Sequence, residues 1–267
     1  MFDFFFDTAD IDYIRDVWSK LESTVDKRHV RGITTNPNAF YKIDQNHLVE
    51  WEQKLPELCA LVTEIRGDDK GIVYVQVPSS EITPDGALAY AKHISQFNDG
   101  STKLGLKIPP FQPILEIVDS LNEIMETNVT GLADAGTALS CLSYGVKYIS
   151  LIPGRMEEQG VDAKAHVSFT NRRKSDDSEI IAGSMRTLEG LRWVVEYGTV
   201  PTIGTRVWAL ILADDFNLAD LLDYNNLDMG GDRFAPFNTQ VNRQLSLDFF
   251  QQMDDCGSTC YRDWQGR

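Results

Sequence analysis

The sequence predicts an α/β protein of the (β/α)₈ barrel class, folded as a single domain. Eight short runs rich in β-branched and aromatic residues alternate with amphipathic stretches of helical period. Such alternation is typical of a parallel sheet covered by helices. The length of 267 residues suits one domain with a large core, and eight strands in this length favour a closed barrel over an open sheet.

The predicted strands are short and mostly apolar. They are Phe2–Phe6, Val30–Thr34, Ile72–Val77, Leu104–Ile108, Asn128–Thr130, Tyr148–Ile152, Glu179–Ala182 and Val200–Ile203. Seven amphipathic stretches predict helices, namely Ile11–Leu21, Leu48–Ile65, Gly86–Phe97, Phe111–Met125, Ala135–Tyr144, Leu188–Tyr197 and Arg206–Ala213.

In two regions the hydrophobic residues do not recur with the period of a helix or a strand. Residues 156–178 are polar and interrupted by Gly160, and they predict a long loop with a poor or short helix. The barrel is expected to span residues 1–214. Residues 215–267 then form a C-terminal extension, in which 215–240 is rich in Asn, Asp and Gly. Within the extension, Asn242–Met253 predicts a terminal helix and 254–267 a polar tail.

Composition and residue spacing argue against several classes of partner and site. A formal net charge of −15 argues against nucleic acid or an anionic membrane, although a small anionic substrate needs only a few cations. The four histidines lack metal-ligand spacing, so no metal site is expected. The four cysteines lack CxxC spacing, which predicts reduced thiols and a cytoplasmic location. The acidic, apolar N-terminus predicts a strand rather than a signal peptide, and no run approaches membrane-spanning length.

Lys107 is the most informative residue. It lies in the apolar run Leu104–Ile108, which two prolines follow. Burial disfavours an ammonium ion, so a buried lysine titrates below its usual pKa of about 10.4 and becomes an amine nucleophile. A lysine that extends from the strand end to water is the structural alternative.

Polar residues recur at the carboxyl ends of the predicted strands, where barrel enzymes place their catalytic groups. Each has a structural alternative, since Asp7 or Asp10 could cap the first helix, Ser184 could cap a later one, and the arginines could pair with surface acids. Gln76 and Asn128 could instead satisfy buried backbone groups. The set around Lys107 comprises Asp7, Thr34, Asn36, Gln76, Asn128, Thr130, Ser150, Arg155, Ser184 and Arg186.

Six motifs in one order resemble the transaldolase family, and the length is most similar to its small subclass, which includes fructose-6-phosphate aldolase. They are Phe-Phe-Asp-Thr-Ala-Asp (5–10), Gly-Ile-Thr-Thr-Asn-Pro-Asn (32–38), Leu-Lys-Ile-Pro (106–109), Thr-Asn-Val-Thr (127–130), Tyr-Ile-Ser-x-x-x-Gly-Arg (148–155) and Ala-Gly-Ser-Met-Arg (182–186). The resemblance implies a TIM barrel without cofactor or metal, and Schiff-base chemistry.

The resemblance implies a role for each residue. Lys107 is expected to condense with a ketose carbonyl, Asp7 to act as general base, and Gln76 and Thr130 to hold the catalytic water. The expected substrate-binding residues are Thr34, Asn36, Asn128 and Ser150, with Arg155, Ser184 and Arg186 at the phosphate of a sugar-phosphate substrate. Planar guanidinium groups suit a phosphate because they bond it bidentately. A homo-oligomer, either a pentamer or a decamer, is also implied.

The leading hypothesis is transfer of a dihydroxyacetone unit from a ketose phosphate to an aldose phosphate. Gln76 leaves open a fructose-6-phosphate aldolase, because that subclass has a glutamine there. Ile152, where the family usually has Phe or Tyr, and the altered segment 131–134 leave open a non-catalytic barrel that binds a sugar phosphate. A metal-dependent aldolase conflicts with the scattered histidines.

Overall fold

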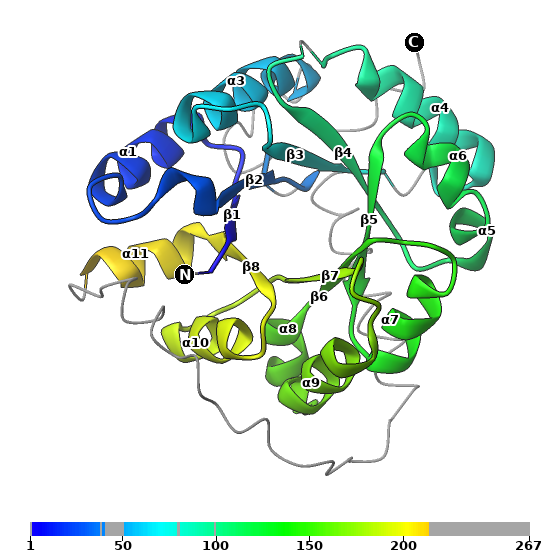
Figure 1. The fold of residues 1–267 in the computed structure, drawn as a ribbon. Coiled ribbons are helices and arrows are strands. Elements are labelled where there is room, and N and C mark those ends of the chain that lie inside the picture. Colours follow the sequence, from blue (N-terminus) through cyan, green and yellow to red (C-terminus); the bar gives the residue numbers. More distant parts are fainter. Residues whose placement is uncertain (1, 38, 41–50, 79–80, 99, 214–267) are drawn as a thin grey trace.

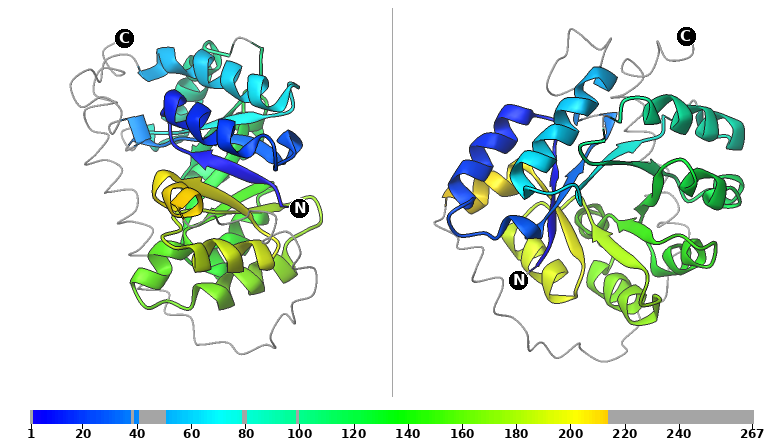
Figure 2. Two further views of the ribbon diagram at one scale, coloured as in Figure 1. Left: turned by 90° about the vertical axis from the view of Figure 1, so that its left-hand side faces the viewer. Right: turned by 45° about the horizontal axis from the view of Figure 1, so that its top comes forward.

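The chain forms a closed barrel of eight parallel strands surrounded by helices (Figure 1). The computed structural model describes residues 2–37, 39–40, 51–78, 81–98 and 100–213. Neighbouring strands pair in sequence order, and β1 (Phe4–Asp7) also pairs with β8 (Val200–Gly204), which closes the sheet. Seen from the side, the strands run between helices on opposite sides of the barrel (Figure 2). The predicted fold class is confirmed.

All eight predicted strands are present, with small differences at their ends. Between β1 and β8 they are β2 (Val30–Thr34), β3 (Ile72–Gln76), β4 (Lys103–Ile108), β5 (Glu126–Leu132), β6 (Tyr148–Leu151) and β7 (Glu179–Ala182). The first begins later than predicted and includes Asp7, and the fifth is longer than predicted at both ends. The register of β5 against β6 shifts between Val129 and Leu132, where Gly131 has a φ of 78°. Such bulges are common beside active sites.

The helices that cover the barrel begin with side-chain caps in several cases. Asp10, Thr83, Asp134, Asp162 and Thr187 each accept a hydrogen bond from a backbone N–H of the following helix. The helices are α1 (Ile11–Leu21), α3 (Lys54–Arg66), α4 (Pro84–Ser95), α5 (Gln112–Leu115), α6 (Val118–Asn122), α7 (Ala135–Leu142), α8 (Pro153–Glu158), α9 (Ala163–Arg173), α10 (Leu188–Glu196) and α11 (Thr205–Ala213). Two short 3₁₀ helices are η1 (Lys27–His29) and η2 (Trp51–Gln53).

The prediction of a long loop with a poor or short helix over 156–178 is wrong. Two helices lie there, α8 and the 11-residue α9. The inward face of α9 is made of Ala163, His166, Val167 and Thr170, which have helical spacing but weak hydrophobicity, so a pattern of large apolar residues is absent. His166 Nδ1 accepts a hydrogen bond from the backbone N–H of Ala135 at 3.1 Å, and burial lowers the pKa of this imidazole. A neutral histidine therefore joins α9 to the start of α7.

Three other predictions need comment. The helix predicted over Phe111–Met125 is two short helices, α5 and α6, separated where Ile117 leaves helical geometry with φ −110° and ψ 13°. The helix predicted from Leu48 begins at Lys54 after η2, and its first predicted residues lie outside the described ranges. The extension over 215–267, with its terminal helix and tail, also lies outside the described residues.

The barrel interior has an apolar layer below a polar one. Phe5, Ile72, Tyr74, Ile181 and Val200 form a buried cluster that contains residues from strands alone, with Tyr148 packed against it. Side chains two positions apart point to the same face of a strand. The residues two positions after Phe5, Tyr74 and Tyr148 are therefore also inward, and they are Asp7, Gln76 and Ser150. The polar layer at the carboxyl ends of the strands thus rests on a packed aromatic floor.

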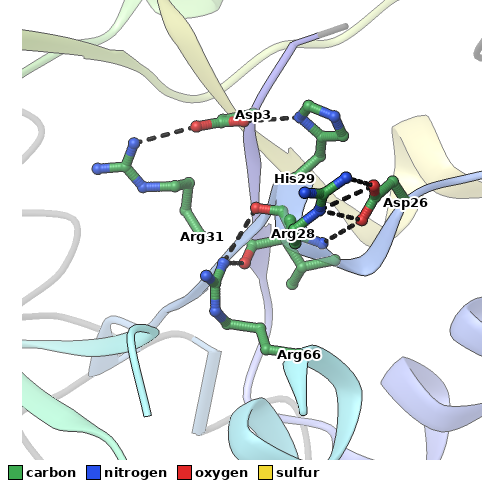
Figure 3. Close-up of polar contacts among 7 residues, drawn as sticks. Asp3, Asp26, Arg28, His29, Arg31 and Arg66 are labelled. Atoms are coloured by element: carbon green, nitrogen blue, oxygen red, sulfur yellow. Dashed lines mark hydrogen bonds and ion pairs between the residues drawn. The ribbon is translucent and has the colours of Figure 1, made fainter. Parts of the chain in front are cut away.

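Ion pairs gather at the opposite, amino-terminal ends of the strands (Figure 3). Asp3 lies between His29 and Arg31, with oxygen–nitrogen distances of 2.8 and 3.1 Å, and Arg31 also contacts Glu179 of β7 at 2.9 Å. The guanidinium of Arg66, from α3, donates to the backbone carbonyls of Arg28 and Val30. These contacts join the chain before β1 to β2, α3 and β7. In barrels of this class this end serves stability rather than chemistry.

Gly32 allows β2 and β3 to approach closely. Its φ is 148°, and a Cβ there would lie 1.8 Å from the carbonyl oxygen of Ile72. Gly32→Ala is expected to destabilise the fold by about 1–3 kcal/mol more than Gly100→Ala, because both residues have positive φ but only Gly32 lacks room. Urea unfolding of the two variants measures the difference, and equal losses would contradict the steric explanation.

Candidate active site

A cavity of about 550 Å³ opens at the carboxyl ends of the strands. Nine of the predicted site residues line it, and they are Asp7, Thr34, Asn36, Lys107, Thr130, Ser150, Arg155, Ser184 and Arg186. They come from β1, β2, β4, β5 and β6, and from the segments that follow β2, β6 and β7. Residues far apart in sequence meet here because parallel strands in a closed barrel end on one rim.

Lys107 lies inside this cavity and is 6% exposed. Its Nζ donates a hydrogen bond to the backbone carbonyl of Thr35 at 3.3 Å. Burial lowers the pKa of Lys107, while the negative charge of Asp7 acts in the opposite direction. The alternative that the lysine extends to water is therefore wrong. A buried amine with a lowered pKa has a larger neutral, nucleophilic fraction at neutral pH.

Asp7 is held by its neighbour on the next strand. Thr34 Oγ1 donates a hydrogen bond to Asp7 Oδ1 at 2.9 Å, and the two residues are register partners across β1 and β2. Asp7 does not cap the first helix, because Asp10 occupies that position and accepts from the N–H of Tyr13. The carboxylate of Asp7 thus lines the cavity with one oxygen oriented by Thr34, as a general base requires.

Gln76 and Asn128 lie on either side of Lys107 and do not line the cavity. They are its register partners on β3 and β5, and they are 2% and 0% exposed. Asn128 Oδ1 accepts a hydrogen bond from Ser150 Oγ at 2.9 Å. Within the described residues its buried Nδ2 has no hydrogen-bond partner. A buried amide donor next to the amine retains the capacity to bond a ligand atom.

Asn36 has a structural role besides its place in the cavity. Its Oδ1 accepts a hydrogen bond from the backbone N–H of Ala39 at 2.9 Å, which orients the side chain at the end of β2. Ser184 does not cap α10, because Thr187 does. Ser184 instead has a φ of 63°, an uncommon value for a residue other than glycine.

Arg155 and Arg186 bring positive charge to one side of the cavity, from α8 and from the segment after β7. Arg186 Nε donates to Glu158 Oε1 at 2.9 Å. Glu158 is not among the residues predicted from the sequence, because it lies on α8 in a region predicted to be a loop. Arg206 and Asp10, which line the cavity, are also absent from the predicted set. An acid three residues after Arg155 would have indicated a shared helical face.

In the described part of the chain, no three His, Cys, Asp or Glu side chains come together as a cation site. Nor does any helix there combine the length and the apolarity needed to cross a bilayer. Cys59 and Cys141 are buried free thiols, and Cys256 and Cys260 lie outside the described ranges.

Lys107→Met is expected to raise the free energy of unfolding at neutral pH by about 0.5–2 kcal/mol, since it replaces a buried functional cation with an apolar chain. Unfolded lysine titrates near pH 10.4, and burial lowers the folded value. Between the two values the unfolded chain binds more protons, so the wild type gains stability as pH rises. The advantage of the variant should therefore shrink through that window in denaturant unfolding at a series of pH values. A difference that stays constant would argue against the lowered pKa.

Comparison with known proteins agrees with this geometry. The sequence profile described as "Transaldolase/Fructose-6-phosphate aldolase" matches residues 4–193. A "Probable transaldolase" from Streptococcus agalactiae serotype V is 30% identical over 212 residues, which are 77% of this chain and 87% of that protein. Another "Probable transaldolase", from Desulfotalea psychrophila, is 29% identical over 189 residues, 68% of this chain and 77% of that protein.

A solved structure adds evidence on the fold alone. The carboxyl transferase domain from Rhizobium etli pyruvate carboxylase with 3-hydroxypyruvate has a TM-score of 0.50 at 10% identity, covering 97% of this chain and 48% of that one. The profile match, by contrast, covers most of the barrel and extends from β1 into α10. On this evidence the chain belongs to the transaldolase/fructose-6-phosphate aldolase family.

Proposed function

We propose that the protein is a transaldolase of the Schiff-base type, which moves a dihydroxyacetone unit from a ketose phosphate to an aldose phosphate. The observation that carries this proposal is the position of Lys107, a buried amine with a lowered pKa inside a polar cavity. Membership of the family supports the reaction class. Other polar residues that line the cavity are proposed to supply the remaining groups.

The first step joins Lys107 to the substrate. The neutral amine attacks the ketose carbonyl carbon, the adduct takes up one proton from solvent, water leaves, and a protonated Schiff base forms. Asp7 then takes the proton from the C4 hydroxyl as the C3–C4 bond breaks. The electron pair of that bond moves into the cationic Schiff base and gives an enamine. The aldose phosphate fragment departs, and the enamine remains on Lys107.

In the second half of the reaction, the same steps occur in reverse order with a different aldehyde. The enamine carbon attacks the carbonyl carbon of an acceptor aldose phosphate, and Asp7 returns the proton to the new alkoxide. Water then hydrolyses the Schiff base and frees the amine. Thr130, which lines the cavity, and Gln76, beside Lys107 on β3, are proposed to position that water. Thr34, Asn36, Asn128 and Ser150 are proposed to hold the hydroxyl groups of the sugar.

The phosphate is proposed to bind between Arg155, Ser184 and Arg186. Two guanidinium groups from separate segments line the same side of the cavity, with a serine hydroxyl between them in sequence order. A phosphate that both arginines contact would be bound by charge-assisted, bidentate hydrogen bonds.

A fructose-6-phosphate aldolase is the second candidate, and Gln76 on the strand next to Lys107 favours it. The two activities differ in the fate of the enamine, which an aldolase protonates and releases as free dihydroxyacetone. Assays with fructose 6-phosphate separate them. Turnover that requires an added aldose phosphate supports the transaldolase, and turnover without an acceptor supports the aldolase.

Reduction with borohydride in the presence of fructose 6-phosphate tests the Schiff base. Mass spectrometry should find the adduct on Lys107 in the wild type and in Lys103→Met, because Lys103 is exposed at the opposite end of the same strand. Lys107→Met should carry no adduct. If the wild type binds substrate but no lysine is modified, the protein is a non-catalytic barrel.

Asp7→Asn is expected to slow carbon–carbon cleavage by roughly 10²–10⁴-fold, because the amide cannot accept the hydroxyl proton. The Schiff base should still form, as borohydride reduction would detect. Asp12→Asn, on the exposed side of α1, is a charge-matched control that should leave the rate unchanged. Complete loss of the adduct in Asp7→Asn would contradict the assigned step.

Arg155→Ala is expected to weaken transition-state binding of phosphorylated donors by about 1.5–3 kcal/mol, or ten- to a hundredfold in kcat/KM, through a lost charged hydrogen bond. The kcat/KM for unphosphorylated donors should change little. Arg15→Ala, on the exposed face of α1, serves as the control. Equal losses for both kinds of donor would remove the phosphate role of Arg155.

A further inference from the structure

Glu158 lies next to the proposed phosphate site without an assigned role. Its carboxylate accepts a hydrogen bond from Arg186 Nε at 2.9 Å, and both side chains line the cavity. Glu158 is three positions after Arg155 on α8, so the two residues share a helical face. An acid that contacts one phosphate-binding arginine and follows the other could either compete with the phosphate or hold the arginine for it.

The backbone segments next to Glu158 are in close contact with each other. A Cβ on Gly154 would lie 1.8 Å from the carbonyl oxygen of Ser184, so the segments after β6 and β7 are in direct backbone contact. Ser184 is held in the left-handed region with a φ of 63°. The two segments are therefore packed backbone to backbone next to Arg186.

The geometry of the ion pair leaves much of Arg186 available. A guanidinium group has five N–H donors, and the bond to Glu158 uses the one on Nε. Within the described residues, the bond to Glu158 is the one hydrogen bond or ion pair recorded for the Arg186 side chain. The Nη donors therefore stay available for a ligand while the side chain is held at its base.

The ion pair between Glu158 and Arg186 is expected to contribute little to folding stability. The Glu158 side chain is 51% exposed and that of Arg186 is 34% exposed, and ion pairs at such exposure contribute little to stability. Orienting a long, flexible side chain before a ligand arrives, by contrast, removes an entropic cost from binding. The consequence of the contact should therefore appear in ligand affinity rather than in folding.

We propose that Glu158 is a positioning residue, which holds Arg186 with its Nη atoms toward the phosphate of the substrate. The inference rests on the proposed phosphate site, and it adds to that site an acid that does not touch the ligand. Glu158 thereby determines specificity, because an oriented Arg186 increases the affinity for phosphorylated sugars only.

Binding of glucitol 6-phosphate tests this role without the chemistry, since this sugar alcohol has no carbonyl group to react with Lys107. Calorimetry should show binding weakened by roughly two- to tenfold in Glu158→Ala, the cost of immobilising one flexible side chain. Glu158→Gln should remain closer to the wild type, because its amide oxygen still accepts a bond from Nε.

Glu157→Gln is the matched control. It removes the same charge from the adjacent position on α8, but Glu157 contacts Trp193 Nε1 at 3.1 Å rather than an arginine of the cavity. Its affinity for glucitol 6-phosphate should equal that of the wild type. In turnover, Glu158→Ala should raise KM for fructose 6-phosphate with kcat kept, and it should leave kcat/KM for free fructose unchanged.

Several results would overturn the proposal. Tighter binding of glucitol 6-phosphate by Glu158→Ala would mean that the carboxylate competes with phosphate, and equal binding would mean that it has no role. An equal loss in Glu157→Gln would indicate a general charge effect. A wild type that does not bind glucitol 6-phosphate would remove both the phosphate site and the role of Glu158. Binding of glucitol 6-phosphate, together with no lysine adduct after borohydride reduction with fructose 6-phosphate, would refute the proposed reaction alone.

Discussion

Pairing of β1 with β8 is the constraint on which the rest of the molecule depends. It closes the sheet, and closure gives every strand an inward face. Alternation then separates the interior into levels, so that a floor with Phe5 and Tyr74 carries Asp7 and Gln76 two residues later. Without closure these polar groups would lie along an edge in water. With it Asp7 lines a cavity at one rim, and Gln76 is buried beside Lys107.

The electrostatics of Lys107 follow from this arrangement. The apolar floor and the neighbouring strands remove water from the amine, which lowers its pKa, while Asp7 partly offsets the effect. The same burial that makes a charged lysine unfavourable in the folded state increases the neutral fraction of its amine, which the proposed reaction requires. The ion pairs of Asp3, His29 and Arg31 join strands at the opposite end, where they do not disturb the cavity.

The side of the cavity with Arg155 and Arg186 is built differently from the side with Lys107. Lys107 and Asp7 lie on strands and are fixed by the sheet, whereas Arg155 and Arg186 lie in segments that follow strands. Such segments need their own restraints, and the contact between Gly154 and Ser184 supplies one in the backbone. The bond from Arg186 to Glu158 supplies one in the side chains. The proposed placement of Arg186 at a phosphate thus rests on contacts between two consecutive βα units.

Local pattern in the sequence was enough to predict the eight strands, their order, and the residues at their carboxyl ends. Strands buried on both faces are rich in β-branched and aromatic residues, and the polar residues that follow them stand out. Helix α9 was not predicted because the residues on its inner face are weakly hydrophobic. The break between α5 and α6 was not predicted because both segments have an apolar pattern of helical period. Only tertiary structure decided that Asp10 rather than Asp7 caps α1, that Gln76 and Asn128 lie beside the cavity, and that Glu158 contacts Arg186. These facts depend on distances between residues from different elements, which barrel closure sets and local sequence does not encode.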